Sequence, residues 1–256
     1  MSRNKQNKSN DIQKSKLWIY GKNSVLFVLE LQKRKIFKLF VSKSNKEFLL
    51  RFIQEKNIKL PQYLIQIVDN EYLNNLLDES CNHQGFLAEV SQKEVLCIDD
   101  FISKECNDKN YLPKLAILDQ ITDPHNVGAI VRSAVAFGVK NIIITKRNSP
   151  TETSVIYKTS SGMLDLVNLI EVSNLNDCIK QLKKVGYWVV GLAGEGGVDI
   201  KEIDNKNIAL VIGSEGKGLR ELVEKNCDVL VKINISNEVE SLNASVAAAL
   251  SFYILN

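Results

Sequence analysis

Apolar residues recur with two different spacings along the first ninety residues of the chain. Intervals of three and four residues are typical of one face of a helix, and short continuous apolar runs are typical of strands. The predicted helices cover 22–35, 46–56 and 70–77, and the predicted strands cover 36–41, 64–68 and 86–90. Because the two kinds of element alternate, we expect a small α/β domain over residues 17–92.

A second alternating pattern runs from residue 114 to residue 256. The predicted strands cover 115–118, 141–145, 187–192, 208–212 and 229–233, and the predicted helices cover 126–137, 175–184, 219–226 and 241–255. These strand segments are largely apolar runs, which is typical of strands buried on both faces. The pattern therefore predicts an α/β domain with a mostly parallel sheet and helices on both of its sides.

Two segments lack such a pattern. The first sixteen residues carry five basic side chains and one acidic one, so we expect a disordered basic tail over 1–16. That tail could hold RNA phosphates weakly or could simply be solvated. The stretch 93–113 carries charge and little periodicity, and it is interpreted as a linker between the two domains.

Composition narrows the class of protein. The chain of 256 residues is 45% hydrophobic and 25% charged, as expected for a globular protein, with no apolar run of membrane-spanning length and no signal peptide. We therefore expect a cytoplasmic protein. Five scattered cysteines and two histidines form no metal-ligand spacing, so neither a disulfide framework nor a metal site is expected. The net charge of +3 permits nucleic-acid binding without requiring it.

The first segment with chemical potential follows the strand 115–118. Asn126 is expected to cap the helix 126–137, and Gly128 allows close approach to its first turn. Arg132 lies further along the same helix, among small and apolar residues. A structural salt bridge and a functional contact to an anion explain this arginine equally well.

The second segment is the glycine-rich turn 213–219, which follows the strand 208–212. Its glycine spacing fits neither a P-loop nor a dinucleotide-binding fingerprint. Tight packing explains most turns of this kind. The embedded Glu215 is unsuited to a phosphate but suits a cationic or hydroxyl-bearing ligand.

The third segment, 234–249, follows the strand 229–233. Either Ser241 or Asn243 can cap the final helix, and the small residues 244–249 permit close helix packing. The ligands of open parallel sheets bind at the carboxyl ends of strands. All three segments follow strands, so we expect them to meet.

Together the three segments resemble the signature motifs of the SpoU family of RNA ribose methyltransferases, part of the SPOUT class. The matching runs are Asn126-x-Gly128-x-x-x-Arg132-Ser133-Ala134, Gly213-Ser214-Glu215-Gly216-x-Gly218 and Ser241-Leu242-Asn243-x-Ser245-Val246-Ala247. Tyr20-Gly21 and His83-Gln84-Gly85 further resemble the L30e-like RNA-binding domain that precedes this module in some members. The resemblance implies a deep trefoil knot within 114–256. It also implies an RNA substrate, in particular a guanosine of 23S rRNA.

The resemblance also implies a cofactor, a set of site residues and an assembly. S-adenosylmethionine would be the cofactor, with no metal, and the chain would form a homodimer whose subunits both contribute to each site. The implied catalytic residues are Arg132, Asn126, Glu215, Ser241 and Asn243. The implied cofactor-binding residues are Leu192, Ala193, Gly194, Ile212, Gly213, Gly216, Ile233 and Leu242. One departure lies at 234–237, where Asn-Ile-Ser-Asn replaces a segment that often carries Pro and Gly.

Three alternatives stay open from the sequence. The substrate could be the ribose of a tRNA or of another rRNA position. The chain could instead be a ribosome-assembly factor that binds RNA without catalysis, or a nucleotide hydrolase built on the turn 213–219. The joint presence of Asn126, Arg132, Glu215 and Asn243 argues against the binding protein, and the glycine spacing argues against the hydrolase.

Overall fold

The computed structural model describes residues 16–77, 81–108, 111–146, 152–194, 197–203 and 207–256. The tail expected over 1–16 therefore lies outside the described residues except for Lys16, which begins the first strand. The chain forms two compact units. The first comprises the residues up to Lys93 together with Glu152–Asp165, and the second comprises Glu94–Thr151 and Leu166–Asn256.

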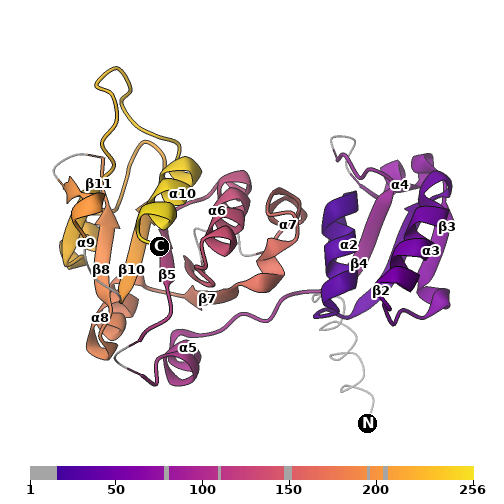
Figure 1. Ribbon diagram of the computed structural model, residues 1–256, viewed down its shortest axis with the longest axis horizontal. Coiled ribbons are helices and arrows are strands. Elements are labelled where there is room, and N and C mark those ends of the chain that lie inside the picture. The colour runs from indigo at the N-terminus through magenta and orange to yellow at the C-terminus, as the bar shows by residue number, and fades with distance from the viewer. Residues whose placement is uncertain (1–15, 78–80, 109–110, 147–151, 195–196, 204–206) are drawn as a thin grey trace, which may run out of the picture. The chain divides into compact units, whose positions relative to one another are not determined.

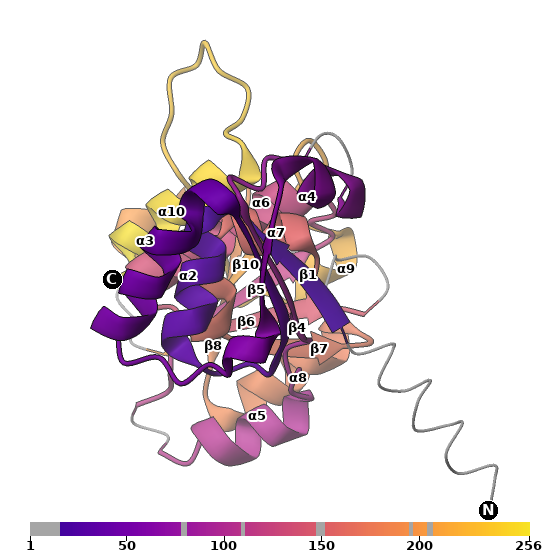
Figure 2. The same cartoon turned by 90° about the vertical axis from the view of Figure 1, so that its right-hand side faces the viewer.

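The first unit is a four-stranded sheet with helices on both faces. Its strands, in the order β1-β4-β2-β3, are β1 (Lys16–Tyr20), β4 (Phe86–Ser91), β2 (Ile36–Ser42) and β3 (Ile65–Val68). Strand β4 is antiparallel to both of its neighbours, whereas β2 and β3 are parallel. The helices are α2 (Lys22–Leu31), α3 (Lys46–Glu55), α4 (Asn70–Leu76) and α7 (Ser154–Thr159). Within this unit, α2 and α3 lie on one side of the sheet and α4 on the other (Figure 2).

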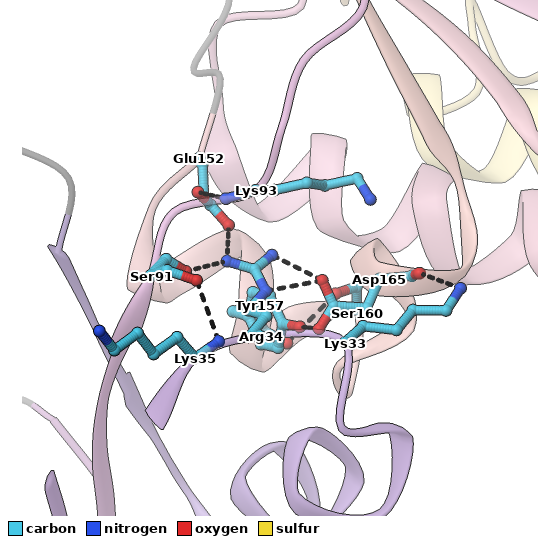
Figure 3. A network of polar contacts seen from close by, with 9 residues as sticks. All are labelled: Lys33, Arg34, Lys35, Ser91, Lys93, Glu152, Tyr157, Ser160 and Asp165. Carbon is cyan, nitrogen blue, oxygen red and sulfur yellow. Dashed lines mark hydrogen bonds and ion pairs between the residues drawn. The ribbon is translucent and has the colours of Figure 1, made fainter. Parts of the chain in front are cut away.

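The segment Glu152–Asp165 is far in sequence from the rest of the first unit, and a buried ion network holds it there (Figure 3). Arg34 is the centre of this network. Its Nε donates to Asp165 Oδ1 at 2.8 Å, and its Nη1 donates to the carbonyl of Ser91. Glu152 pairs with the same guanidinium, which also lies over the ring of Tyr157. Because a buried charge is costly unless it is paired, these contacts fix the segment firmly within the unit.

The second unit is a seven-stranded sheet in which every paired strand is parallel, as the apolar runs predicted. Its strands, in spatial order, are β7 (Asn168–Val172), β6 (Asn141–Thr145), β5 (Leu115–Asp119), β10 (Ile208–Gly213), β8 (Trp188–Leu192), β11 (Val229–Lys232) and β9 (Val198–Asp199). The crossover that places β10 between β5 and β8 brings their carboxyl ends together. The trefoil knot within 114–256 stays a prediction from the family resemblance.

Helices cover both faces of this sheet. The helices are α5 (Ile98–Glu105), α6 (Pro124–Ala136), α8 (Leu175–Val185), α9 (Glu221–Asn226) and α10 (Ala244–Ile254). Figure 1 shows α8 and α9 on one side of the strands and α6 and α10 on the other. A core of strand residues such as Ile117, Val189 and Val211 packs with residues of α5, α8 and α9. The small residues of α10 allow it to pack closely beside α6.

Three features differ from the sequence expectations. The segment 93–113, interpreted as a linker, contains α5, whose Phe101 is fully buried. Asn126 does not cap α6: Pro124 occupies the first helical position, and the Asp123 side chain accepts the amide of His125. The final helix begins at Ala244 rather than at 241, because Asn243 provides its cap. The short elements β1, β7, β9 and α7 were not predicted.

Candidate active site

A cavity of about 490 Å³ lies at the carboxyl ends of the neighbouring strands β10, β8 and β11. It is the place where ligands of open parallel sheets bind. Its lining includes all eight residues assigned to the cofactor from the sequence: Leu192, Ala193, Gly194, Ile212, Gly213, Gly216, Ile233 and Leu242. Glu215 and Ser241 line the same cavity. The second and third segments therefore line one cavity, and the first segment meets them through Asn126, which contacts Glu215 and Asn243.

The wall after β10 is a closed turn that requires glycine. Ser214 and Gly218 exchange two backbone hydrogen bonds, of 3.1 and 2.9 Å, which fold the turn back on itself. A Cβ on Gly213 would lie 2.3 Å from the carbonyl carbon of Gly218, too close for any side chain. Gly216 and Gly218 adopt φ angles of 82° and 63°, which glycine tolerates best. The glycines thus define the shape of the cavity wall.

A buried carboxylate anchors the end of this turn, and the sequence reasoning missed it. Asp119, the last residue of β5, is completely buried. Its Oδ2 accepts the backbone amide of Arg220 at 2.9 Å, and its Oδ1 accepts Arg220 Nε at 2.7 Å. The signal that could have revealed it is an acidic residue ending a strand that is otherwise apolar.

Asn126, Glu215 and Asn243 form an amide–carboxylate cluster. Asn243 Oδ1 accepts the backbone amide of Ser245 at 2.9 Å, so its Nδ2 must point the other way. That Nδ2 donates to Glu215 Oε2 at 2.8 Å and to Asn126 Oδ1 at 3.1 Å. The amide of Asn126 then faces Glu215 Oε2 at 3.5 Å. The orientation of the cluster therefore follows from one helix cap.

This cluster leaves an acceptor available for a ligand. Both amide donors reach Oε2 of Glu215, and among the described residues no hydrogen bond reaches its Oε1. Glu215 lines the cavity. A carboxylate oxygen at this position can accept a hydrogen bond from a ligand hydroxyl or pair with a ligand cation.

Arg132 lies apart from the cluster. It follows Asn126 by six residues on α6, which corresponds to a rotation of about 240° and a rise of about 9 Å. Its side chain is exposed, and among the described residues it makes no ion pair or hydrogen bond. Arg132 therefore makes no hydrogen bond or ion pair with Asn126 or Glu215 in this chain. Ser241 is exposed at the cavity and does not cap α10.

The departure at 234–237 leaves the neighbouring loop tied to the sheet. Asn234 Nδ2 donates to Asp199 Oδ2 of β9 at 2.7 Å. Strand β9 pairs in turn with β11, the strand that precedes the loop. The asparagine thus supplies an anchor in a segment where proline and glycine are common.

The structure also bears on metal ligands, membrane-spanning helices and disulfides. Within the described ranges, no three His, Cys, Asp or Glu side chains gather as metal ligands do. No helix in the same ranges is both long and apolar enough for a membrane span. The five cysteines are free thiols, and burial raises the pKa of Cys178 to about 12.

Family models match both parts of the chain. Residues 113–253 match the SpoU rRNA Methylase family. Residues 18–96 match the RNA 2′-O ribose methyltransferase substrate binding domain. The first match covers the second unit's sheet and all of the residues that line its cavity.

Similar proteins align with nearly the whole chain. YacO of Bacillus subtilis, assigned to the TrmH family of tRNA/rRNA methyltransferases, is 37% identical over 92% of this chain and 93% of its own. The 23S rRNA (guanosine-2′-O-)-methyltransferase RlmB of Coxiella burnetii is 39% identical with the same coverage. Among solved structures, the SpoU methyltransferase AviRb of Streptomyces viridochromogenes, in complex with AdoMet, has a TM-score of 0.75 at 20% identity, covering 100% of this chain and 92% of its own.

Proposed function

This chain belongs to the SpoU rRNA methylase family, and from that premise we propose that it methylates the ribose 2′-hydroxyl of a guanosine in 23S rRNA with S-adenosylmethionine. The cavity after β10, β8 and β11 is the observation that carries the proposal, because the second and third family motifs line it and Asn126 of the first motif contacts Glu215 at its wall. The substrate-binding domain matched over residues 18–96 supports an RNA substrate. Because ribosomal RNA is found in the cytoplasm, we place the reaction there.

The residues present fit S-adenosylmethionine. A cavity of about 490 Å³ is of the size usual for small-molecule sites. Leu192, Ile212, Ile233 and Leu242 offer apolar walls for the adenine ring and the methylene groups of the cofactor. Glu215 disfavours a phosphate there but suits the hydroxyls or the positive charge of this cofactor. AviRb, a related fold, was crystallised with the same compound.

The reaction needs an activated hydroxyl as well as a methyl donor. When bound, S-adenosylmethionine supplies a methyl group on a sulfonium, which is electrophilic without further activation. The ribose 2′-hydroxyl is a poor nucleophile and must lose its proton as its oxygen bonds to carbon. Asn126, Glu215 and Asn243 would position the ribose relative to the glycine turn 213–219, which lines the cofactor cavity. Ser241 would position the substrate at the opening of the cavity.

Arg132 would stabilise negative charge rather than remove the proton. A guanidinium stays protonated in proteins, so it cannot act as a base at neutral pH. It can hold an RNA phosphate, or the developing alkoxide, while a phosphate oxygen or water accepts the proton. Its exposed position, facing away from its own cluster, suits contact with a ligand that is shared between subunits.

A homodimer would complete this site. Val246, Leu250 and Tyr253 form an apolar stripe on α10, and their exposed fractions lie between 39% and 68%. The ring of Tyr253 meets Phe137 of α6 edge-on, with centroids 5.8 Å apart. Contiguous exposed apolar surface of this kind marks interaction sites. A second copy packed on the α6–α10 surface would cover it and bring Arg132 to the partner's cavity.

The proposal is tested by methyl transfer in vitro. Purified protein would be incubated with methyl-tritiated S-adenosylmethionine and, separately, with large-subunit rRNA and with total tRNA lacking modifications. The proposal predicts label in the rRNA and its recovery as 2′-O-methylguanosine after nuclease digestion. Label in tRNA alone would identify a tRNA enzyme instead, and RNA binding without transfer would support the non-catalytic assembly factor.

A further inference from the structure

A second cavity, of about 510 Å³, lies in the first unit, outside the catalytic site. Its lining residues are Ser42, Ser44, Asn45, Asn70, Asn74, Cys81, Asn82, His83, Gln84 and Gly85. Asparagine and glutamine predominate, and none of these ten residues is acidic or a lysine or arginine. A phosphate or a metal ion would find no counter-charge in such a lining. A planar ligand with both donors and acceptors on its edge would find partners.

One histidine fixes the polarity of this lining. The backbone amide of Gly85 donates to His83 Nδ1 at 2.9 Å, so Nδ1 carries no proton. The proton is then on Nε2, which donates to Asn74 Oδ1 at 2.9 Å. Burial lowers the pKa of His83, with the charge of Lys158 as a further cause, and both effects favour this neutral form. Asn74 therefore uses its carbonyl oxygen on the histidine and keeps its amide donors for other partners.

The segment His83–Gly85 is anchored to the end of β2. Gln84 and Gly85 have φ angles of 52° and 80°, and a Cβ on Gly85 would lie 2.3 Å from Asn45 Nδ2. Asn45 Nδ2 donates to Ser42 Oγ and to the carbonyl of Gln84, and so ties the loop to the end of β2. The donors and acceptors of the cavity are thus held in place before any ligand arrives. Such preorganisation favours recognition of one edge pattern.

Two lysines flank this loop. The backbone amide of Lys22 donates to Gln84 Oε1 at 3.1 Å, and Lys158 Nζ donates to the carbonyl of Asn82. Lys158 Nζ also lies 4.8 Å from the centre of the Tyr20 ring. An uncharged polar cavity with the cationic side chain of Lys158 beside it matches one nucleotide of a single strand, with its base inside and a phosphate outside. Proteins read unpaired RNA bases in this way, on their hydrogen-bonding edges.

We propose that this cavity binds an unpaired nucleobase of the RNA substrate, with Asn70 and Asn74 as the residues that read its edge. The inference rests on the proposed function for the identity of the polymer. It adds a recognition site in the first unit that is separate from the residues that perform methyl transfer.

The test compares single-stranded with double-stranded RNA. Full-length protein without S-adenosylmethionine would be titrated into a fluorescent unstructured RNA 12-mer and into the duplex of the same sequence, with anisotropy as the readout. Asn70→Ala removes an exposed amide that makes no hydrogen bond among the described residues. Asn74→Asp keeps the acceptor for His83 but removes the amide donor. Gln54→Glu, on the exposed surface of α3, is the matched control for the added charge.

Each cavity variant should weaken binding of the single strand about tenfold and leave duplex binding unchanged, a loss expected for one paired amide–base contact. Gln54→Glu should leave both affinities as in the wild type. Unchanged single-strand affinity in Asn70→Ala and Asn74→Asp, or an equal loss for both RNAs, would overturn the inference. Because the assay contains no methyl donor, its result is independent of whether methyl transfer is observed.

Discussion

At the residue scale, the site depends on a few side chains whose orientation is determined by backbone contacts. Asn243 is oriented by the amide of Ser245, and through Asn243 the side chains of Asn126 and Glu215 are oriented too. Among the residues that the structure describes, none makes a hydrogen bond or ion pair that orients Arg132. This difference suggests two kinds of role. The cluster of Asn126, Glu215 and Asn243 would hold a ligand in place, and Arg132 would stabilise the negative charge that develops in the transition state.

Replacement of Arg132 by Ala should reduce the rate of methyl transfer at least about 100-fold, as loss of a charge-stabilising donor typically does. The affinity for S-adenosylmethionine, measured by calorimetry, should stay within about twofold, because Arg132 does not line the cavity. Arg132→Lys is the matched control: it keeps the charge without the planar fork and should recover part of the rate. Near-wild-type turnover of Arg132→Ala would remove this residue from the mechanism.

Asp119→Asn should destabilise the second unit and loosen the glycine turn. The asparagine NH₂ group would face one of the two Arg220 donors at a completely buried position, and a buried donor left without an acceptor costs about 1–3 kcal/mol. We expect a loss of about 2 kcal/mol in the free energy of unfolding, measured with denaturant, together with weaker cofactor binding. An unchanged free energy of unfolding would show that the pair does not anchor the turn.

At the scale of elements, the hydrophobic pattern predicted most of the architecture. The central strands and the amphipathic helices were found because their apolar residues form continuous runs or recur at helical spacing. Short elements carry the weakest periodic signal, and five of them were missed: β1, β7, β9, α5 and α7 are two to eight residues long. The capping error at Asn126 arose because Pro124 starts α6 two residues earlier.

The order of the strands in the seven-stranded sheet could not be predicted from the sequence either. Periodicity predicts that β10 exists, but only tertiary packing places it between β5 and β8. The convergence of the three motifs could be expected all the same, because each follows a parallel strand. The contact between Glu215 and Asn243 could not, since it depends on the register of α10 relative to the turn after β10.

Gly213→Ala should distort the turn 213–219, which forms the cavity wall, while leaving the sheet folded. The added methyl would meet the backbone of Gly218, which cannot move without opening the turn. We expect affinity for S-adenosylmethionine to fall more than tenfold in calorimetry, with little change in far-ultraviolet circular dichroism. Gly138→Ala, at the end of α6, is the control: its Cβ meets open space and adds only backbone strain of about 1 kcal/mol. Equal cofactor affinity in the two variants would contradict this account of the turn.

At the scale of the whole molecule, the chain passes three times between the two units, after Lys93, after Thr151 and after Asp165. A single flexible linker, as the sequence suggested for 93–113, would pass only once. The ion network around Arg34 makes the segment Glu152–Asp165 part of the first unit (Figure 3). The proposed RNA-reading unit and the proposed catalytic unit are therefore interleaved in sequence.

The exposed stripe on α10 predicts a dimer that charge should disrupt. Leu250→Glu combined with Tyr253→Lys would place charges in a surface that we expect to be buried, and should raise the dimer dissociation constant more than 100-fold. Light scattering coupled to gel filtration would detect the monomer. Leu222→Glu on α9, also strongly exposed, is the control that should stay dimeric. Monomeric wild-type protein with full activity would contradict the proposal of a shared site.

The central claim is methylation of a ribose 2′-hydroxyl in ribosomal RNA, and mapping of 2′-O-methyl groups in cells tests it most directly. RNA would be compared from cells with the protein, cells without it, and cells that carry Arg132→Ala. The account predicts that one 2′-O-methylguanosine of 23S rRNA is lost without the protein and is not restored by Arg132→Ala. An unchanged map of 2′-O-methyl groups in all three samples would contradict it.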